Sequence, residues 1–303
     1  PYSHAFSIDS FGGARDNMET YKYHNKKTYR QIVVKSMKVT IITSCFNRAT
    51  TIGDAIESVM SQDYPDIEYI IVDGASKDGT LDVLRRYDSM AHSDEFAKTH
   101  PHFTFRFISE PDHGMYEGIN KGLRMATGDI IGLVHSDDFL FTEHTLTDIV
   151  REFEATGADF VYGDGLFMDA NDTKKAVRNW KGGRYSKGKV HCGWLPLHPT
   201  CYLRSSFYKE VGPYNEKYKI AADTDFLVRA LYEHSPKVAY LKEYIVRMRM
   251  GGLSTDSAKR KAMWKEDIDI YSSHGFAALP TKIMKIMWKI PQFVSAKFGS
   301  VKA

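Results

Sequence analysis

The first half of the chain alternates between short apolar runs and stripes of apolar residues at helical spacing. The β-branched run at residues 38–44 predicts a buried strand. A helical stripe over residues 52–60 follows, with Thr50 or Thr51 as its cap, and it ends before Pro65. The folded part of the chain is therefore expected to open with a strand and a helix.

The same alternation continues as far as residue 134. Further strands are predicted at 67–72, 103–108 and 129–134, and further helices near 81–87 and around 119–126. Strand, helix and strand in succession predict right-handed crossovers onto a mostly parallel sheet with helices on both faces. Ligands of such sheets bind beyond the carboxyl ends of the strands. Those ends are the segments after Thr43, Val72, Ile108 and Val134.

Beyond residue 160 the pattern becomes mixed. It predicts strands at 160–162 and 200–203, a hairpin around 171–172, and helices at 222–233 and 253–273. Residues 281–298 place three lysines among apolar residues and are interrupted by Pro291, which is typical of a basic amphipathic segment. The expected fold class is α/β, with a mixed second half and C-terminal helices.

Charge and composition exclude several classes of protein. The 303 residues carry a net charge of +3, but residues 1–36 hold six Lys or Arg against three acids, and residues 281–303 hold five Lys and no acid, which leaves −5 for the body. An acidic body is a poor nucleic-acid binder. No apolar run is long enough to span a bilayer, and residues 1–36 do not resemble a signal peptide. Three cysteines without a paired spacing favour a reducing compartment, so we expect a cytoplasmic protein.

The segment His135-Ser136-Asp137-Asp138 follows the predicted strand at 129–134 directly. Adjacent carboxylates repel one another, so they persist best where a divalent cation compensates their charge. One carboxylate with phosphate oxygens is a common way to hold Mg²⁺ or Mn²⁺ on a diphosphate. The alternative is a solvated turn in which an aspartate caps the helix that begins near Thr142.

Two further loops follow predicted strands. In the segment 73–80, Asp73 can accept a hydrogen bond from a base or a ribose hydroxyl, while Gly74 and Gly79 leave room for the ligand. The alternative is an ordinary turn-rich loop in which Asp78 caps a helix. The loop at 44–48 is mostly turn chemistry when taken alone.

Together these segments resemble a known family. The strand at 39–43, Asn47-Arg48, Ile56-x-Ser58-Val59-x-x-Gln62, the loop at 72–80, the segment 114–128 and Ser136-Asp137-Asp138 resemble inverting family 2 glycosyltransferases of the GT-A fold. The resemblance covers about residues 37–255. It implies a nucleotide-sugar half at 37–140 and an acceptor half at 141–255, between an extension of unknown role at 1–36 and a helical region at 256–303.

The resemblance assigns roles at the donor end. Thr43 and Asp73 would contact the nucleoside, Asp137 the ribose, and Asp138 a Mn²⁺ or Mg²⁺ ion on the diphosphate. The other expected nucleotide-sugar-binding residues belong to the same motifs: Asn47, Arg48 and Ser76. Many relatives have an aspartate where His135 stands, which leaves one carboxylate fewer here. The Gln-x-x-Arg-Trp motif of processive synthases is absent, so a single transfer is favoured over polymerisation.

The segment 221–226 resembles the one that holds the catalytic base of the family. Helical spacing separates its two aspartates. Asp223 is in register with apolar residues such as Phe226, whereas Asp225 lies four residues before Arg229, a pairing available on an exposed face. We therefore expect Asp223 to be the catalytic base and Asp225 to be structural. An inward aspartate at a helix start can also be a cap.

Three further residues are weaker candidates for contacts with the acceptor or the diphosphate. His198 precedes a proline ahead of a strand, and Trp194 lies in the same segment; a hydrogen-bonded structural histidine is the alternative. Arg249 precedes a Gly-Gly pair that resembles a flexible family loop beside the active site, and a solvated arginine is the alternative.

These observations predict metal-dependent, inverting transfer of one sugar from a nucleotide sugar to a hydroxyl of a glycan or lipid-linked acceptor. By the resemblance, UDP is the commonest nucleotide, and polysaccharide or lipopolysaccharide assembly is the usual setting. A non-catalytic nucleotide- or glycan-binding protein of the same fold is the alternative. A sugar-phosphate nucleotidyltransferase is disfavoured because no Gly-rich phosphate loop follows the first strand. The segment 281–298 either contacts the inner face of the cytoplasmic membrane or packs on the body.

Overall fold

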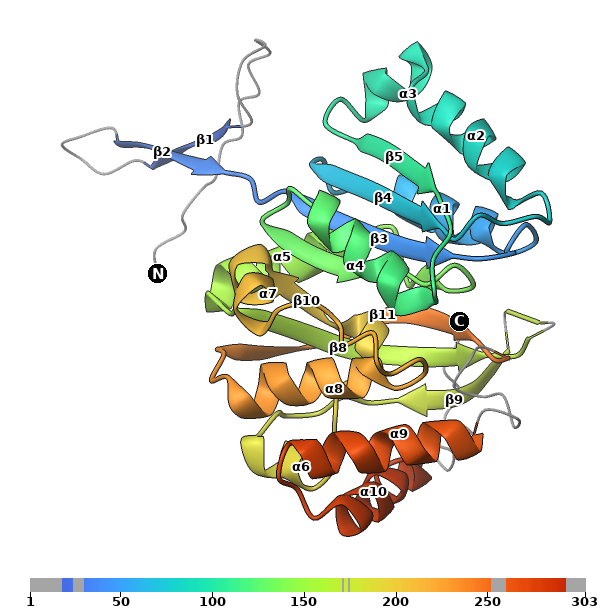
Figure 1. The fold of residues 1–303 in the computed structure, drawn as a ribbon. Coiled ribbons are helices and arrows are strands. Elements are labelled where there is room, and N and C mark those ends of the chain that lie inside the picture. Colours follow the sequence, from blue (N-terminus) through green and yellow to red (C-terminus); the bar gives the residue numbers. More distant parts are fainter. Residues whose placement is uncertain (1–17, 24–29, 171, 174, 252–259, 293–303) are drawn as a thin grey trace.

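The order of the strands places the predicted parallel half beside a mixed half in one sheet (Figure 1). The computed structural model describes residues 18–23, 30–170, 172–173, 175–251 and 260–292. Within these residues a nine-stranded sheet runs in the order β5-β4-β3-β6-β10-β8-β11-β7, with β9 paired to β8. Strands β1 (Met18–Tyr23) and β2 (Arg30–Lys35) form a separate antiparallel hairpin.

The parallel half contains the four strands expected from the sequence. They are β3 (Val39–Cys45), β4 (Ile67–Asp73), β5 (Thr104–Ser109) and β6 (Ile130–Leu133). β3 pairs in parallel with β4 and β6, and β4 pairs in parallel with β5. Their carboxyl ends therefore share one edge of the sheet.

Successive residues of β3 pack into two different cores, because side chains alternate across a strand. Ile41 packs on the side of α1 (Ile52–Met60), α2 (Thr80–Ala91) and α5 (Thr145–Thr156). Ile42 packs on the side of α4 (Met115–Met125). A Cβ on Gly122 of α4 would lie 2.4 Å from Ile42 Cγ2, so a glycine is needed for this close approach. The prediction of helices on both faces is confirmed.

The mixed half contains the remaining strands of the sheet. They are β7 (Phe139–Leu140), β8 (Phe160–Met168), β9 (Ala176–Trp180), β10 (Tyr202–Arg204) and β11 (Val238–Arg249). β10 pairs antiparallel with both β6 and β8, and so joins the two halves. β8 and β9 form the predicted hairpin, although Asn171 lies outside the described residues. The long strand β11 was not predicted.

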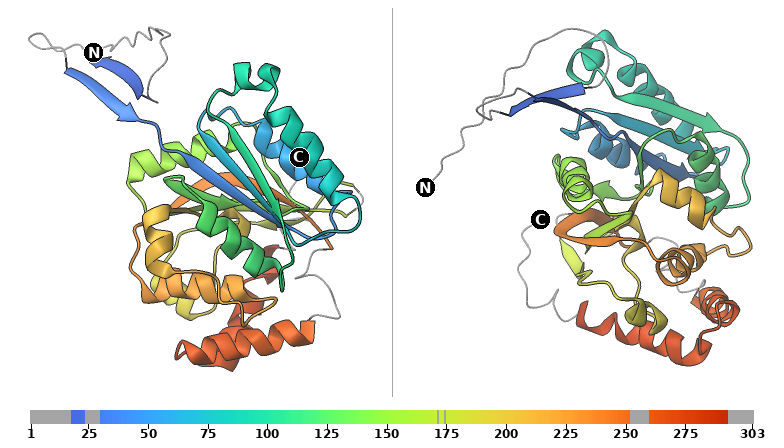
Figure 2. Two further views of the ribbon diagram at one scale, coloured as in Figure 1. Left: turned by 45° about the horizontal axis from the view of Figure 1, so that its top comes forward. Right: turned by 90° about the vertical axis from the view of Figure 1, so that its left-hand side faces the viewer.

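Of the remaining helices, α3 (Asp94–Thr99) lies beside α2 at the parallel end, and the others cover the mixed half and the opposite end of the molecule. They are α6 (Lys187–His191), the 3₁₀ turn η1 (His198–Thr200), α7 (Ser205–Val211), α8 (Ala222–Val228) with the π turn η2 (Arg229–Glu233), α9 (Arg260–Ser273) and α10 (Ala278–Met287). Figure 2 shows α9 and α10 at the end opposite to α2 and α3. The predicted helix at 253–273 begins in residues that are not described. None of the described helices is both long and apolar enough to cross a bilayer.

Candidate active site

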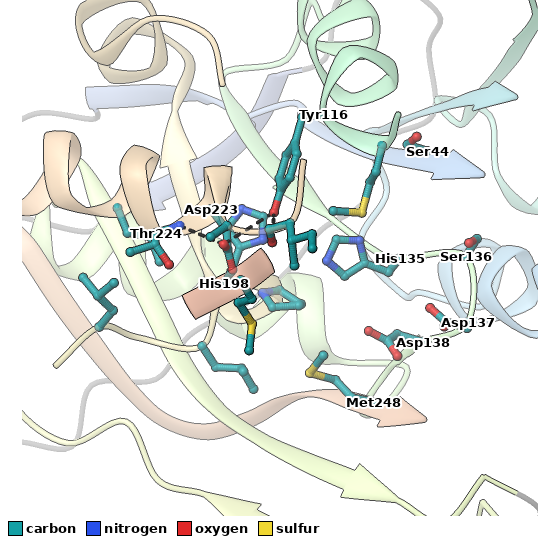
Figure 3. A pocket seen from close by; sticks show the side chains of 18 of the residues that line it. Ser44, Tyr116, His135, Ser136, Asp137, Asp138, His198, Asp223, Thr224 and Met248 are labelled. Atoms are coloured by element: carbon teal, nitrogen blue, oxygen red, sulfur yellow. Dashed lines mark hydrogen bonds between the residues drawn. The ribbon is translucent and has the colours of Figure 1, made fainter. Parts of the chain in front are cut away.

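A pocket of about 780 Å³ lies between the carboxyl ends of the parallel strands and the mixed half. It brings together segments that are far apart in the sequence (Figure 3). The predicted site residues in its lining are Asn47, Arg48, Asp137, Asp138, Trp194, His198, Asp223 and Arg249. The residues after β3 and β6 form one end of the pocket, which we call the donor end. Residues of β9, α8 and α10 form the other, which we call the acceptor end.

Asp138 is the buried acid in the lining of the donor end. Its side chain is 2% exposed, and its Oδ1 accepts a hydrogen bond of 3.1 Å from the backbone N–H of Arg249. Its buried Oδ2 has no hydrogen-bond partner among the described residues. Burial, and then the charge of Asp137, hold the pKa of Asp138 well above its ordinary value. A buried carboxylate oxygen without a partner fits a cation ligand.

The protein itself offers few other metal ligands. No group of three or more His, Cys, Asp or Glu side chains within the described ranges is arranged to hold a metal ion. A divalent cation at Asp138 would therefore take most of its ligands from a bound diphosphate and from water, as Mg²⁺ usually does.

Three of the predicted donor-site residues lie beneath the pocket rather than in its lining. Thr43 is fully buried, and its hydroxyl donates to Val134 O at 2.6 Å. Asp73 Oδ2 accepts from the Ser76 N–H at 3.0 Å and from Ser109 Oγ at 2.7 Å. Asp73 and Ser76 therefore hold the two loops that follow β3 and β4 in position.

The same network fixes the rim of the donor end. Asn47 has a φ of 53°, a left-handed conformation that asparagine tolerates better than most residues. Its N–H donates to Ser76 Oγ at 2.7 Å, and its Oδ1 accepts from the Lys77 N–H at 2.9 Å. The backbone N–H of Arg48 donates to Thr80 Oγ1 at 2.8 Å. The Arg48 side chain is part of the pocket lining.

Asp223 lies in the first turn of α8, in the lining of the pocket. Its Oδ1 accepts from the Thr224 N–H at 2.8 Å and from Tyr116 Oη at 3.4 Å. No described residue donates a hydrogen bond to its Oδ2, so one oxygen of the carboxylate is available to a ligand. Figure 3 shows Asp223 across the pocket from Asp137 and Asp138.

The sequence predicts that Asp225 is a structural residue on an exposed face. The predicted exposure is wrong. Asp225 is paired with Arg229 at 3.0 Å as predicted, and it is 4% exposed. The cause is α9, whose following residue His274 covers Asp225 and approaches its Oδ1 to 3.1 Å. The hydrogen bond to His274 and the charge of Arg229 offset burial and hold the pKa of Asp225 below its usual range.

Two histidines form the floor between Asp138 and Asp223. The rings of His135 and His198 lie 5.9 Å apart. His198 Nε2 is hydrogen-bonded to Tyr214 Oη at 2.8 Å, so this histidine also has the structural partner that the alternative anticipated. Burial lowers the pKa of both histidines, that of His198 to about 4, so both rings are neutral at pH 7.

The other two weak candidates are engaged in packing and pairing. Trp194 is 5% exposed and meets Tyr162 edge to face, with the ring centroids 5.8 Å apart. The Arg249 guanidinium pairs with Asp54 and lies over the Phe139 ring. The loop expected to follow Arg249 lies mostly outside the described residues.

Several residues of the pocket lining were not predicted from the sequence. Tyr116, Arg178, Lys285 and Lys289 all line the pocket. Tyr116 is buried, and burial next to Asp223 raises the pKa of its hydroxyl, so it remains a hydrogen-bond donor. The only sequence signal for Lys285 and Lys289 was their position in the basic amphipathic segment.

Comparison with known proteins identifies the family. The profile of glycosyl transferase family 2 matches residues 40–209, more than half of the chain. An uncharacterized glycosyltransferase of Nostoc sp. is 31% identical over 240 residues, 76% of this chain and 70% of the relative. A PGL/p-HBAD biosynthesis glycosyltransferase of Mycobacterium bovis is 28% identical over 218 residues, 71% of this chain and 78% of the relative. The chain belongs to glycosyl transferase family 2.

Solved structures support the GT-A fold. TarS residues 1–349 of S. aureus, in complex with UDP-GlcNAc, has a TM-score of 0.58 at 17% identity, over 86% of this chain and 73% of TarS 1–349. The mannosyltransferase PcManGT of Pyrobaculum calidifontis, in complex with GDP-Man and Mn²⁺, has a TM-score of 0.55 at 19% identity, over 86% and 74% of the two chains.

Proposed function

We propose that the protein transfers one sugar, with inversion, from a nucleotide sugar to a hydroxyl of a glycan or lipid-linked acceptor. One observation carries the proposal: a carboxylate with an unengaged oxygen, Asp223, shares a pocket with Asp137 and the buried Asp138. Family membership supports the class of reaction. The nucleotide sugars named for TarS and PcManGT support the class of donor.

At the donor end, Asp137 and Asp138 suit a donor diphosphate that is accompanied by a divalent cation. Asp138 Oδ2, buried and without a partner, is the oxygen that would hold Mn²⁺ or Mg²⁺. Such a cation, when bound, offsets negative charge on a leaving diphosphate. Asp73, Ser76 and Thr43 support the two loops against which the nucleoside would lie.

At Asp223, the proposed step is proton transfer. The acceptor hydroxyl attacks the anomeric carbon, the bond from that carbon to the diphosphate breaks, and the hydroxyl proton passes to Asp223. The Thr224 N–H fixes one carboxylate oxygen, which leaves the other to accept the proton. A single displacement inverts the anomeric configuration.

The test is the Asp223→Asn variant, which keeps the size of the side chain and removes the base. Release of nucleoside diphosphate from a panel of UDP-, GDP- and dTDP-sugars is measured with water and simple glycosides as acceptors. We expect a fall of about 10²- to 10⁴-fold, the usual contribution of a general base. Asp82→Asn, at an aspartate whose side chain is 81% exposed on α2, is the matched control and should retain full activity. Retained turnover in Asp223→Asn contradicts the assignment, and no turnover in the unaltered protein favours the non-catalytic alternative.

We also propose that α10 contacts a membrane that carries the lipid-linked acceptor. The lysine face of this helix packs on the body, and Lys282 is 5% exposed. Packing on the body was one of the two alternatives that the sequence left open. The apolar face of α10 is open to solvent: Ile283, Ile286, Met287 and Ile290 are 44–58% exposed. Lys285 and Trp288 of the same segment line the pocket. Contact between the apolar face and lipid would therefore bring the pocket to a lipid-linked acceptor.

Vesicles of anionic phospholipid test this contact by co-sedimentation. Lys297 and Lys302 follow the helix in the sequence without any acid between 281 and 303, which suits an anionic surface. Replacing Ile283, Ile286 and Met287 together by serine should abolish binding. Met90→Ser on α2, where Met90 is 46% exposed, is the control for loss of an exposed methionine. Unchanged binding of the triple variant contradicts the contact.

A further inference from the structure

The acceptor end of the pocket contains a group of four cations. Arg178 of β9 and Lys282, Lys285 and Lys289 of the α10 segment come together there. Three of them, Arg178, Lys285 and Lys289, line the pocket itself. We call these four residues the cationic cluster.

One buried acid compensates part of the cluster. Asp267 of α9 is 1% exposed and pairs with Lys282 and, at 2.8 Å, with Lys285. Lys285 Nζ also donates to Thr224 Oγ1 at 2.8 Å. Arg178 Nε donates to the neutral side chain of Gln292 at 2.7 Å, and its guanidinium lies over the Phe167 ring. The three lysines of the cluster therefore carry more positive charge than Asp267 alone can balance.

Lys289 carries the excess. Its ammonium group has no hydrogen-bond or ion-pair partner among the described residues, although the residue is only partly exposed. Burial, and then the charges of Lys285, Arg178 and Lys282, lower the pKa of Lys289 to about 8. Burying a cation without a counter-ion is unfavourable. The position of Lys289 therefore destabilises the folded protein when no anionic ligand is bound.

The cluster lies away from the donor diphosphate site. Lys285 is bonded to Thr224, and Figure 3 shows Thr224 on the side of Asp223 that faces away from Asp137 and Asp138. Trp180 and Trp288 line the pocket with the cluster, and their rings can cover a sugar or an aliphatic stem. A ligand group bound by the cluster would thus lie beyond Asp223 from the donor.

We propose that the cationic cluster binds an oxyanion, a phosphate or a carboxylate, carried by the acceptor, with Lys289 as its direct contact. That the anion belongs to the acceptor rests on the proposed function, whereas the anion site itself does not. An anionic substituent held there would orient the acceptor so that its reactive hydroxyl meets Asp223. A neutral glycan would leave the Lys289 charge without a partner in the complex.

The test is thermal unfolding of the full chain, without metal, during titration with inorganic phosphate at constant ionic strength in chloride. A ligand that binds the folded state raises the unfolding temperature. We expect phosphate to do so, and Lys289→Met to weaken phosphate binding about tenfold or more, as loss of a charged hydrogen bond does. Lys289→Met should also unfold at a higher temperature than the unaltered protein when phosphate is absent. Lys289→Gln repeats the test with a polar side chain.

Controls separate the possible outcomes. Lys209→Met removes an exposed lysine on α7 and should change neither quantity. An equal response in the Lys289 variants and the unaltered protein, or a lower unfolding temperature in both variants, overturns the proposal. An equal loss of affinity for UDP with Mn²⁺ also overturns it, because the cluster would then serve the donor.

A second titration distinguishes the two kinds of anion. Stabilisation by phosphate but not by acetate assigns the site to a phosphate-bearing acceptor, and equal stabilisation by both admits an acidic sugar. These titrations require no sugar transfer. Failure of the Asp223 assignment therefore leaves the anion site standing, and failure of the phosphate response leaves the proposed reaction standing.

Discussion

The two ends of the pocket differ in charge and in the way the chain builds them. The donor end has the acids Asp137 and Asp138, and it is made from loops that directly follow neighbouring strands. The acceptor end has the cations Arg178, Lys285 and Lys289, which come from β9, from α10 and from the turn that follows α10. The two ends therefore suit groups of opposite charge. The acids of the donor end suit a metal cation that accompanies a diphosphate, and the cations of the acceptor end suit an anion.

Removing the acid of the donor end should have the largest effect. Asp138→Asn is expected to lower metal-dependent turnover at least about a hundredfold, since a bound metal stabilises the transition state by several kcal/mol. The same change should raise the unfolding temperature without metal, because Asp138 is buried beside Asp137 with a raised pKa. Turnover assays with Mn²⁺ and unfolding in EDTA measure the two effects. A lower unfolding temperature in EDTA would mean that Asp138 is a structural residue.

The acid of the acceptor end should have the largest effect on stability. Asp267→Asn leaves Lys282 and Lys285 without their buried counter-ion, which is expected to destabilise the fold by about 3–5 kcal/mol. Urea unfolding measures the change. Asp269→Asn on the same helix, at a half-exposed partner of Lys217, is the matched control and should cost less than about 1 kcal/mol. Similar losses in the two variants would show that Asp267 does not balance the cluster.

A smaller effect separates the two aspartates of α8. His274 donates a hydrogen bond to Asp225, and this bond, with a second one to Glu233, raises the pKa of His274 against the effect of burial. A raised pKa means that the folded state binds the proton more tightly, so the stability is present below the unfolded pKa of about 6.5 and is lost as pH rises through the folded value. We expect about 1 kcal/mol less stability at pH 8 than at pH 6 from this pair, and a smaller loss in Asp225→Asn, where Glu233 remains as the partner of His274. Urea unfolding at the two pH values tests it, and an unchanged pH dependence in the variant contradicts it.

The donor end could be predicted from the sequence because its signals are local. Each loop follows its own strand, and adjacent parallel strands bring the loops to one edge of the sheet. The sequence did not show which groups would be engaged. Thr43 and Asp73 are held by Val134, Ser76 and Ser109, contacts that depend on the packing of several loops.

The acceptor end could not be predicted in the same way because its contacts join distant segments. The pattern of α10 shows two faces, but it does not say which face packs on the body. Asp267 decides this, because it draws Lys282 and Lys285 inward and leaves the apolar face outside. The burial of Asp225 likewise depends on His274, which lies 49 residues further along the chain.

We propose that the donor end binds a nucleoside diphosphate with a metal ion, and that Asp223 acts only in the later transfer step. The most direct test is the unfolding temperature with UDP, GDP, dTDP and CDP, each with and without Mn²⁺, in the unaltered protein, Asp138→Asn and Asp223→Asn. The account predicts a Mn²⁺-dependent rise with one nucleotide that is lost in Asp138→Asn and retained in Asp223→Asn. No rise with any nucleotide, or an equal loss in both variants, would contradict it.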